Sequence, residues 1–368
     1  MNLNPLMIFV SVLKLLLYPF SLLYGAIMWL RNRLYDTGIY SSVQFSVPVI
    51  SVGNLSTGGT GKTPHIEYLM RLLRYEYLVA TQSRGYKRRS RGFKLADEST
   101  TAYEIGDEPM QFKLKFPEMS VSVCEERMTG IPALLAERPE TEVILLDDAY
   151  QHRSVKAGLN ILITDYSRPF YTDYVLPFGN LREGRRAAKR AHVIIVSKCP
   201  ADLPEAERKA ITARINPLPH QKVFFTHIRY GTCFDFFTGN PVSLQKEQHI
   251  ILVSGIARPE PMLHHLREKV ADVHLLRYPD HHYFTTANLE EIKQTCKNWE
   301  AKQPVIITTE KDATRLALHR DTLQAWGVPV WVLPIEIDFI EGKEQFDQIV
   351  LEYIVDTRMS FYAAMENF

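Results

Sequence analysis

The sequence predicts an α/β protein built around an open, mostly parallel sheet with helices on both faces. Runs of apolar residues with the length of a strand recur along the chain and alternate with helical patterns. These runs are apolar throughout, which is typical of strands buried on both faces. One run leads into a Gly-rich turn and then a helix, the order of elements found at nucleotide sites of such sheets.

The composition is that of a globular protein with room for two domains. The chain has 368 residues, of which 46% are hydrophobic and 23% charged. Its formal net charge of +1 provides no overall field that would mark a nucleic-acid-binding protein. The four cysteines are scattered without a C-x-x-C pair, so we expect no zinc site, no disulfide framework and a reducing cytosolic setting.

The first 35 residues differ from the rest of the chain. Residues 6–30 are apolar over about the length of a bilayer-spanning helix, interrupted by Lys14 and Pro19. Arg31 and Arg33 follow directly, which favours a cytosolic location for the next domain. We expect a membrane-associated helix over 1–35. A helix that spans the bilayer, a helix in the membrane surface and an apolar helix packed on the protein all remain open.

A nucleotide-binding domain is predicted over 36–221, followed by a connector and a smaller α/β domain. Helical patterns cover 62–75 and 126–138, between strand-length runs at 47–53, 77–83, 119–124, 142–147, 160–165 and 192–198. Alternating aromatic residues around Gly231 predict a hairpin within a connector at 222–240. The smaller domain, 241–368, has strand-length runs at 249–255, 273–278, 304–312 and 329–334, and a terminus expected to be helical without chemistry.

The Gly-rich turn is a candidate phosphate-binding loop. "SVGNLSTGGTGKT", residues 51–63, has Ser56 where the strict pattern requires glycine, but "TGGTGKT" resembles the variant loop K-G-G-x-G-K-[ST]. Glycines allow a tight turn whose N–H groups cradle an anion at the start of a helix. Lys62 would reach the β- and γ-phosphates and Thr63 would ligate Mg²⁺. The alternative is a flexible turn that happens to contain G-K-T. The predicted nucleotide-binding residues are Ser56, Thr57, Gly58, Gly59, Thr60, Gly61, Lys62 and Thr63.

A second part of this site is expected at "EVILLDDAYQH", where Asp147 and Asp148 end a predicted buried strand. Carboxylates at this edge of a sheet lie beside the phosphate loop and hold Mg²⁺ directly or through water. An ordinary solvated aspartate pair is the alternative.

Phosphate transfer to a hydroxyl needs a group that accepts the hydroxyl proton. Asp107 in "GDEP" is one candidate, although the same residues suit a helix cap. His281 and His282 in "YPDHHYFT" are others, although they suit a surface pair equally well. An aspartate and a histidine brought together across the interdomain cleft would form a base dyad.

Two basic stretches, 83–94 and 181–190, are either solvated loops or the binding surface for an anionic ligand. Their position in a chain with an apolar N-terminal segment favours lipid headgroups or a phosphorylated lipid over nucleic acid. Arg182 and Glu183 are expected near the transferred phosphate. In "TTEKDA" the lysine is one place too late for the guanine-reading pattern [NT]-K-x-D, so we expect ATP, with this segment packed against the base.

The motifs "SVGNLSTGGTGKTP", "SRGY", "GDEP", "LLDDAYQH", "LPFGNLRE", "YPDHHYFT" and "TEKDA" occur in this order. Together they resemble the tetraacyldisaccharide 4'-kinase family of lipid A biosynthesis, up to about residue 315. The resemblance implies a P-loop NTPase-like α/β/α domain and a smaller α/β/α domain joined by a β-ribbon, behind an N-terminal membrane helix. It implies transfer of the γ-phosphate of ATP, with Mg²⁺, to the 4'-hydroxyl of a tetraacyldisaccharide 1-phosphate. The reaction would take place at the cytosolic face of the inner membrane, and no protein partner is implied.

The resemblance also implies roles for individual residues. Lys62, Asp107 and His281 would be catalytic, with His282 less favoured by counting from Pro279. The metal site would comprise Thr63, Asp147, Asp148, Gln151 and Glu183. The substrate-binding residues would be Arg84, Tyr86, Arg127 and Arg182.

One departure from the family pattern concerns the loop that usually reads Asp-Asp-Gly-Phe-Gln-His, where this chain has Ala149 and Tyr150. We expect no positive φ at Ala149, because alanine disfavours it.

Two other classes of protein fit parts of the sequence. One is a membrane-bound GTPase or ATPase that acts as a switch or chaperone, which would hydrolyse nucleotide without a lipid acceptor. The other is a non-catalytic nucleotide-binding scaffold, whose function would survive Asp107→Ala and Asp148→Ala.

Overall fold

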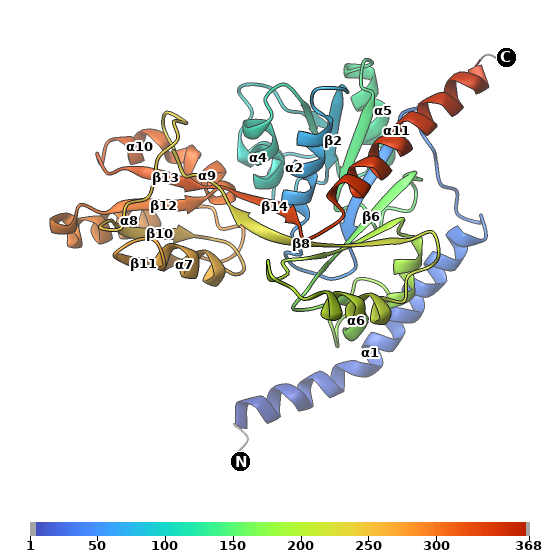
Figure 1. Cartoon of the computed structure of the whole chain (residues 1–368), viewed down its shortest axis with the longest axis horizontal. Helices are drawn as coiled ribbons and strands as arrows, with labels where there is room; N and C mark the ends of the chain where they lie inside the picture. Colours follow the sequence, from blue (N-terminus) through green and yellow to red (C-terminus); the bar gives the residue numbers. More distant parts are fainter. Residues whose placement is uncertain (1–4, 366–368) are drawn as a thin grey trace. The chain divides into compact units, whose positions relative to one another are not determined.

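The computed structural model describes residues 5–365, which form two compact units (Figure 1). The first unit contains the residues up to Ser83, Glu126–Ile228 and those from Ile337 onward, and the second contains Arg84–Glu125 and Arg229–Glu336. The predicted boundaries differ from this division. Residues 84–125 belong to the second unit because their helix α4 (Asp107–Lys115) packs on α9 (Glu310–Leu316). The C-terminal residues return to the first unit.

The first unit is built on a parallel sheet, as the sequence predicts. Six strands lie in the order β8-β7-β6-β1-β5-β2, and all five pairings between them are parallel. The strands are β1 (Val49–Asn54), β2 (Val79–Ser83), β5 (Val143–Asp147), β6 (Leu159–Asp165), β7 (Val193–Ser197) and β8 (Lys222–Tyr230). Because β1 lies between β5 and β6, its carboxyl end marks the point where the strand order reverses, which is where such sheets bind ligands.

Helices cover both faces of this sheet. Successive residues of a strand point to opposite faces, and Phe224 and Phe225 of β8 show which helices cover each. Phe224 contacts Phe346 of α11 (Lys343–Met365), which also contacts Tyr68 of α2 (Lys62–Leu73). Phe225 packs with Ile211 of α6 (Glu205–Ile215) on the other face.

The N-terminal helix α1 (Pro5–Asp36) includes the predicted apolar segment, whose side chains before residue 16 lie outside the described part. No helix within the described residues is both long enough and apolar enough to cross a bilayer. Of the alternatives left open for this segment, the bilayer-spanning helix is therefore not supported. The second half of α1 carries Ser21, Tyr24 and Asn32, whose polar side chains bond to the segment 175–183 of the same unit.

The second unit contains a five-stranded sheet in the order β11-β10-β12-β13-β9. Its strands are β9 (Phe234–Asp235), β10 (His249–Ser254), β11 (Asp272–Arg277), β12 (Val305–Thr309) and β13 (Val330–Leu333), with only β9 antiparallel to its neighbour. Helices α7 (Glu260–Arg267) and α8 (Thr286–Asn298) bury opposite faces of this sheet in two core clusters. The α/β class predicted for this region is confirmed.

The predicted hairpin around Gly231 is wrong. β8 pairs in parallel with β7, whereas β9 pairs with β13, so the two flanking strands belong to different sheets. β8 instead neighbours β14 (Ile335–Phe339), and the chain passes from one unit to the other within both strands. The connecting ribbon is therefore made of two segments that lie far apart in the sequence.

Candidate functional site: a phosphate loop and an aspartate–histidine pair

The candidate phosphate loop joins β1 to α2 at the carboxyl edge of the first unit's sheet. Gly58 and Gly61 have φ values of +96° and +90°, the left-handed region that favours glycine, and Gly61 is the N-cap of α2. Ser56 forms an antiparallel bridge with Leu181 and does not have a positive φ. Glycine is therefore not required at position 56, which explains the departure from the strict pattern.

Three successive carbonyl groups of the loop are bonded into the protein. The Gly61 oxygen accepts from His65 Nδ1 at 2.7 Å and the Thr60 oxygen from Ser197 Oγ at 2.6 Å. The Gly59 oxygen accepts from the Lys198 ammonium. In a planar trans peptide the N–H points opposite to the C=O. The N–H groups of residues 60, 61 and 62 therefore point away from these partners, as an anion site requires.

His65, Ser197 and Lys198 were not predicted as site residues. His65 is buried, and burial lowers its pKa to about 4, so the ring is neutral near pH 7. With the proton on Nδ1, its Nε2 accepts from the Thr226 hydroxyl at 3.0 Å. The histidine thereby ties the start of α2 to β8. Its partner lies 161 residues away in the sequence, which is why the pattern around "GKTPH" did not reveal it.

A charged cluster adjoins the loop. Asp148 lies 3.5 Å from the Lys62 ammonium, and both of its oxygens accept from Arg182 at 2.9 Å. Burial raises the Asp148 pKa, but Lys62 and Arg182 outweigh this effect and hold the pKa below its usual value. Asp148 adopts φ +49° and Ala149 does not have a positive φ, so the expectation for Ala149 is confirmed.

The two other polar residues expected at the metal, Gln151 and Glu183, bond to each other. The Glu183 side chain is fully buried and accepts from Gln151 Nε2 at 3.0 Å, Arg190 at 2.8 Å and Asn32 at 2.8 Å. Gln151 Nε2 also donates to the Asn54 carbonyl at 2.9 Å. With three donors on its carboxylate, Glu183 organises the end of β1 in this conformation.

Residues that suit a Mg²⁺ ion are present at the loop. No group of three or more His, Cys, Asp or Glu side chains in the described residues could hold a metal by itself. Mg²⁺ beside a nucleotide needs only one or two protein oxygens, because phosphates and water supply the rest. Asp148, with a 32% exposed side chain beside Lys62, and Thr63, at the start of α2, fit this requirement.

The predicted substrate-binding residues fall into two groups. Arg84 and Tyr86 are exposed in the second unit, and Arg182 is partly exposed in the first. Arg127 is only 1% exposed, and its guanidinium donates to the carbonyl of Asp147, which is also buried, at 3.0 Å. Direct substrate contact by Arg127 is thus not supported, because its side chain lies in the interior.

The second unit brings Asp107 and His281 together. His281 Nδ1 lies 2.8 Å from Asp107 Oδ2 and 3.1 Å from Oδ1. Asp107 is the first residue of α4, is 3% exposed, and also contacts Arg315 at 3.1 Å. Burial raises its pKa, but the bond to His281 and the nearby cations outweigh this and lower the pKa. The pair lies within one unit and not across a cleft, since 84–125 belong to the second unit.

His282 has a different environment. Its Nε2 bonds to Asn288 Oδ1 at 2.8 Å, and its ring stacks on Tyr278 with the centroids 5.1 Å apart. The structure therefore distinguishes two histidines that the sequence left open, and only His281 faces Asp107. Tyr86 approaches the His281 ring edge-on at 5.0 Å.

Two cations beside this pair lie on one helix: Lys311 belongs to the "TTEKDA" segment, which was expected to pack against a nucleotide base, and Arg315 follows two residues after that segment. The predicted strand ends at Thr309, and α9 begins at Glu310. Lys311 Nζ lies 3.1 Å from His281 Nε2, while the buried Arg315 contacts both Asp107 and Asp312. Lys311 and Arg315 are four residues apart on a helix that follows a buried strand, and this spacing was the sequence feature that could have predicted their common location.

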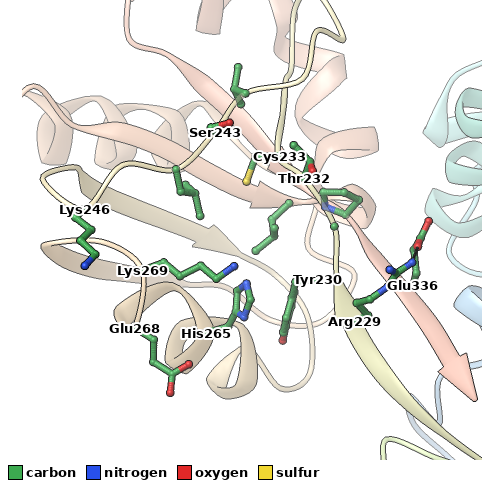
Figure 2. Close-up of a pocket in the computed structure, with 15 residues that line it drawn as sticks. Arg229, Tyr230, Thr232, Cys233, Ser243, Lys246, His265, Glu268, Lys269 and Glu336 are labelled. Atoms are coloured by element: carbon green, nitrogen blue, oxygen red, sulfur yellow. Dashed lines mark hydrogen bonds and ion pairs between the residues drawn. The ribbon is translucent and has the colours of Figure 1, made fainter. Parts of the chain in front are cut away.

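The second unit also has an open hollow of about 790 Å³, which no motif predicted (Figure 2). Tyr230, His265 and Lys269 lie together on one side of it, with the Tyr230 and His265 rings stacked at 4.1 Å. Neither Asp107 nor His281 lines this hollow.

Comparisons with known proteins agree with the resemblance drawn from the motifs. The family model described as LpxK, tetraacyldisaccharide-1-P 4'-kinase, matches residues 13–355. A relative from Bacteroides thetaiotaomicron named tetraacyldisaccharide 4'-kinase is 44% identical, covering 95% of this chain and 96% of its own. One of the same name from Flavobacterium johnsoniae is 45% identical, covering 94% and 98%. A crystal structure described as an "apo" form of LpxK from Aquifex aeolicus in complex with ATP superimposes with a TM-score of 0.72 at 30% identity, covering 93% and 99%. The chain thus belongs to the tetraacyldisaccharide-1-P 4'-kinase family and is a kinase.

Proposed function

We propose that this protein transfers the γ-phosphate of ATP to the 4'-hydroxyl of a tetraacyldisaccharide 1-phosphate, a step of lipid A biosynthesis. Membership of the family and the phosphate loop support a kinase. The observation that supports transfer to a hydroxyl acceptor is the 2.8 Å contact between Asp107 and His281. A buried aspartate bonded to a histidine suits proton removal from a sugar hydroxyl, which a nucleotide switch does not need.

The first unit would bind the nucleotide. The N–H groups of residues 60–62 and the start of α2 suit the phosphate groups. Lys62 is already close to Asp148 and would stabilise the charge of the transferred phosphoryl group, with Arg182 as a second cation. When bound, Mg²⁺ would neutralise phosphate charge, and Thr63 and Asp148 are the residues we expect to hold it.

The second unit would provide the base. Asp107 fixes the His281 ring, and the imidazole is the group that accepts the hydroxyl proton as the oxygen attacks phosphorus. Arg84 and Tyr86, exposed in the same unit, would bind the substrate. Arg127 is not included, because it is buried.

We further propose that α1 lies in the surface of the inner membrane, with both units in the cytoplasm. Leu16, Phe20, Leu23, Ile27 and Leu30 are 53–65% exposed and follow one another at spacings of four, three, four and three residues. This spacing forms one apolar stripe along a helix, as in helices that lie in a membrane interface. A lipid substrate gains about 0.8 kcal/mol per buried CH₂ by staying in the bilayer, so its enzyme benefits from binding there.

The test is phosphate transfer with purified protein in detergent. Labelled ATP, Mg²⁺ and a tetraacyldisaccharide 1-phosphate should yield labelled lipid with the wild type, none with Lys62→Ala and strongly reduced amounts with Asp107→Ala. Label released only as free phosphate, at a rate that Asp107→Ala does not change, would refute the lipid kinase and favour a nucleotide switch.

A further inference from the structure

Lys311 occupies the one nitrogen of His281 that would accept a proton. Its Nζ lies 3.1 Å from His281 Nε2 and 3.1 Å from Glu108 Oε1. An ammonium group has three donors and no acceptor. Nε2 therefore accepts this bond and carries no hydrogen, and the ring proton lies on Nδ1, which donates to Asp107.

This bond has a consequence for the base. The Asp107 oxygens already accept from the His281 ring and from the Glu108 N–H at 3.0 Å, and they form an ion pair with Arg315, so the carboxylate is a poor proton acceptor. The Nε2 lone pair is then the group with the basicity to accept a hydroxyl proton. While the ammonium is bound to it, a hydroxyl cannot bind there, and protonation would place two positive charges side by side.

We propose that Lys311 is a positioning residue that blocks His281 Nε2 until phosphate groups of the bound substrates draw the ammonium away. This inference rests on the proposed function. Once Nε2 is free, the hydroxyl O–H bond breaks and its proton goes to Nε2. The hydroxyl oxygen bonds to the γ-phosphorus, the bond from that phosphorus to the bridging oxygen breaks, and ADP leaves.

The charged groups around the His281 ring determine how mutations should change proton binding at Nε2. Asp280 from the preceding loop lies 3.9 Å from Nε2 and 3.9 Å from Lys311. Glu108 on α4 holds the ammonium from the other side. Asp107 and, through it, Arg315 face Nδ1. Lys311 is therefore the cation at Nε2, and Asp280 is the anion closest to that nitrogen among these groups.

The test compares the pH dependence of kcat/KM for lipid phosphorylation in Lys311→Met, Lys311→Arg and Asp280→Asn. The base works unprotonated, and a neighbouring cation disfavours its protonation. Lys311→Met should therefore move the acidic limb of the kcat/KM profile to higher pH by about 1 unit, which is at the low end of the effect of a neighbouring charge. Removing the Asp280 anion should move the limb to lower pH, and Lys311→Arg should leave it in place. Lys302→Met, the same change at a lysine paired with Asp272 in the same unit, is the matched control.

A second readout does not depend on activity. Nitrogen-15 NMR of the His281 ring should show Nδ1–H in the wild type and in Lys311→Met, because Asp107 holds that proton, but the Nε2 resonance should move from a hydrogen-bonded to an unbound position in Lys311→Met. An unmoved acidic limb together with an unmoved Nε2 resonance in folded Lys311→Met would overturn the inference while lipid phosphorylation by the wild type still stood. Absence of lipid phosphorylation by the wild type would instead refute the proposed function.

Discussion

The side-chain amide of Asn32 donates a 2.8 Å hydrogen bond to the Glu183 carboxylate and so links the N-terminal helix to the nucleotide site. Glu183 accepts from Gln151, and Gln151 donates to the carbonyl of Asn54, the last residue of β1. Three consecutive bonds therefore connect α1 to the strand that leads into the phosphate loop. The helix is a structural component of the loop's surroundings as well as a candidate membrane contact.

Asn32→Leu should weaken phosphate transfer and lower the stability of the first unit. The change removes a hydrogen bond to a buried carboxylate, which contributes about 1.5–3 kcal/mol. Thermal unfolding and kcat measure the two effects. Asn298→Leu changes an exposed asparagine whose amide oxygen accepts a bond from Gln294 in the same helix, so it should alter neither. Equal losses in the two variants would show that the Asn32 bond has no special role.

Lys62→Met should lower kcat by about 10²–10³-fold, the usual effect of removing a group that stabilises transition-state charge. Arg182 would still compensate Asp148, so we expect the fold to remain. The assay is labelled phosphate transfer, with circular dichroism as the check on folding. Lys209→Met, at a 77% exposed lysine paired with Glu205, should behave as the wild type. A kcat for Lys62→Met within a factor of two of wild type would exclude Lys62 from the reaction.

The sequence predicted the central strands of the first sheet to within a residue or two because burial on both faces leaves continuous apolar runs, whereas the run at 304–312 extends three residues past the end of its strand at Thr309. The sequence-based prediction failed where strand pairing or helix packing depends on a segment far away in the chain. The hairpin at Gly231 is replaced by pairing of β8 with β7, and the first predicted domain loses 84–125 because α4 packs on α9.

The candidate site shows the same division. Lys62 and Asp148 were found because a short motif fixes their chemistry. His65 and Lys311 were missed, because their partners lie 161 and 30 residues away.

Asp107→Asn should reduce lipid phosphorylation by about 10²–10⁴-fold, the range for a group involved in proton transfer, while ATP still binds. The side chain keeps its shape but loses the charge that stabilises a protonated His281. ATP binding by calorimetry should be unchanged, since the phosphate loop belongs to the other unit. Asp272→Asn, at an exposed aspartate paired with Lys302, is the control. Loss of ATP binding in Asp107→Asn would point to general damage and not to the base.

Acid should destabilise the first unit through His65. Its folded pKa of about 4 lies below the ordinary value of 6.5, so the unfolded chain binds the proton more readily between these values. Stability should then fall as pH decreases from about 6.5 to 4, by up to about 3 kcal/mol from this group. His65→Gln should remove this part of the pH dependence in urea unfolding, and His264→Gln, at a 79% exposed ring, should not. The same slope in His65→Gln as in wild type would contradict the buried neutral ring.

The final prediction concerns membrane binding by the apolar stripe on α1. Leu23 and Ile27 are 62% and 57% exposed, and burying each in a membrane surface is worth about 1.5–3 kcal/mol. Leu23→Glu with Ile27→Glu should therefore reduce binding to vesicles of anionic phospholipid by at least 100-fold in a sedimentation assay. Leu78→Glu, at a 55% exposed leucine elsewhere in the first unit, should bind as the wild type. ATP binding should survive in both variants, because Asn32, which bonds to Glu183, lies on the side of the helix opposite Leu23 and Ile27. If the double variant still sediments with the vesicles, attachment must come from the basic stretches, and α1 would be only the structural support that its bond to Glu183 indicates.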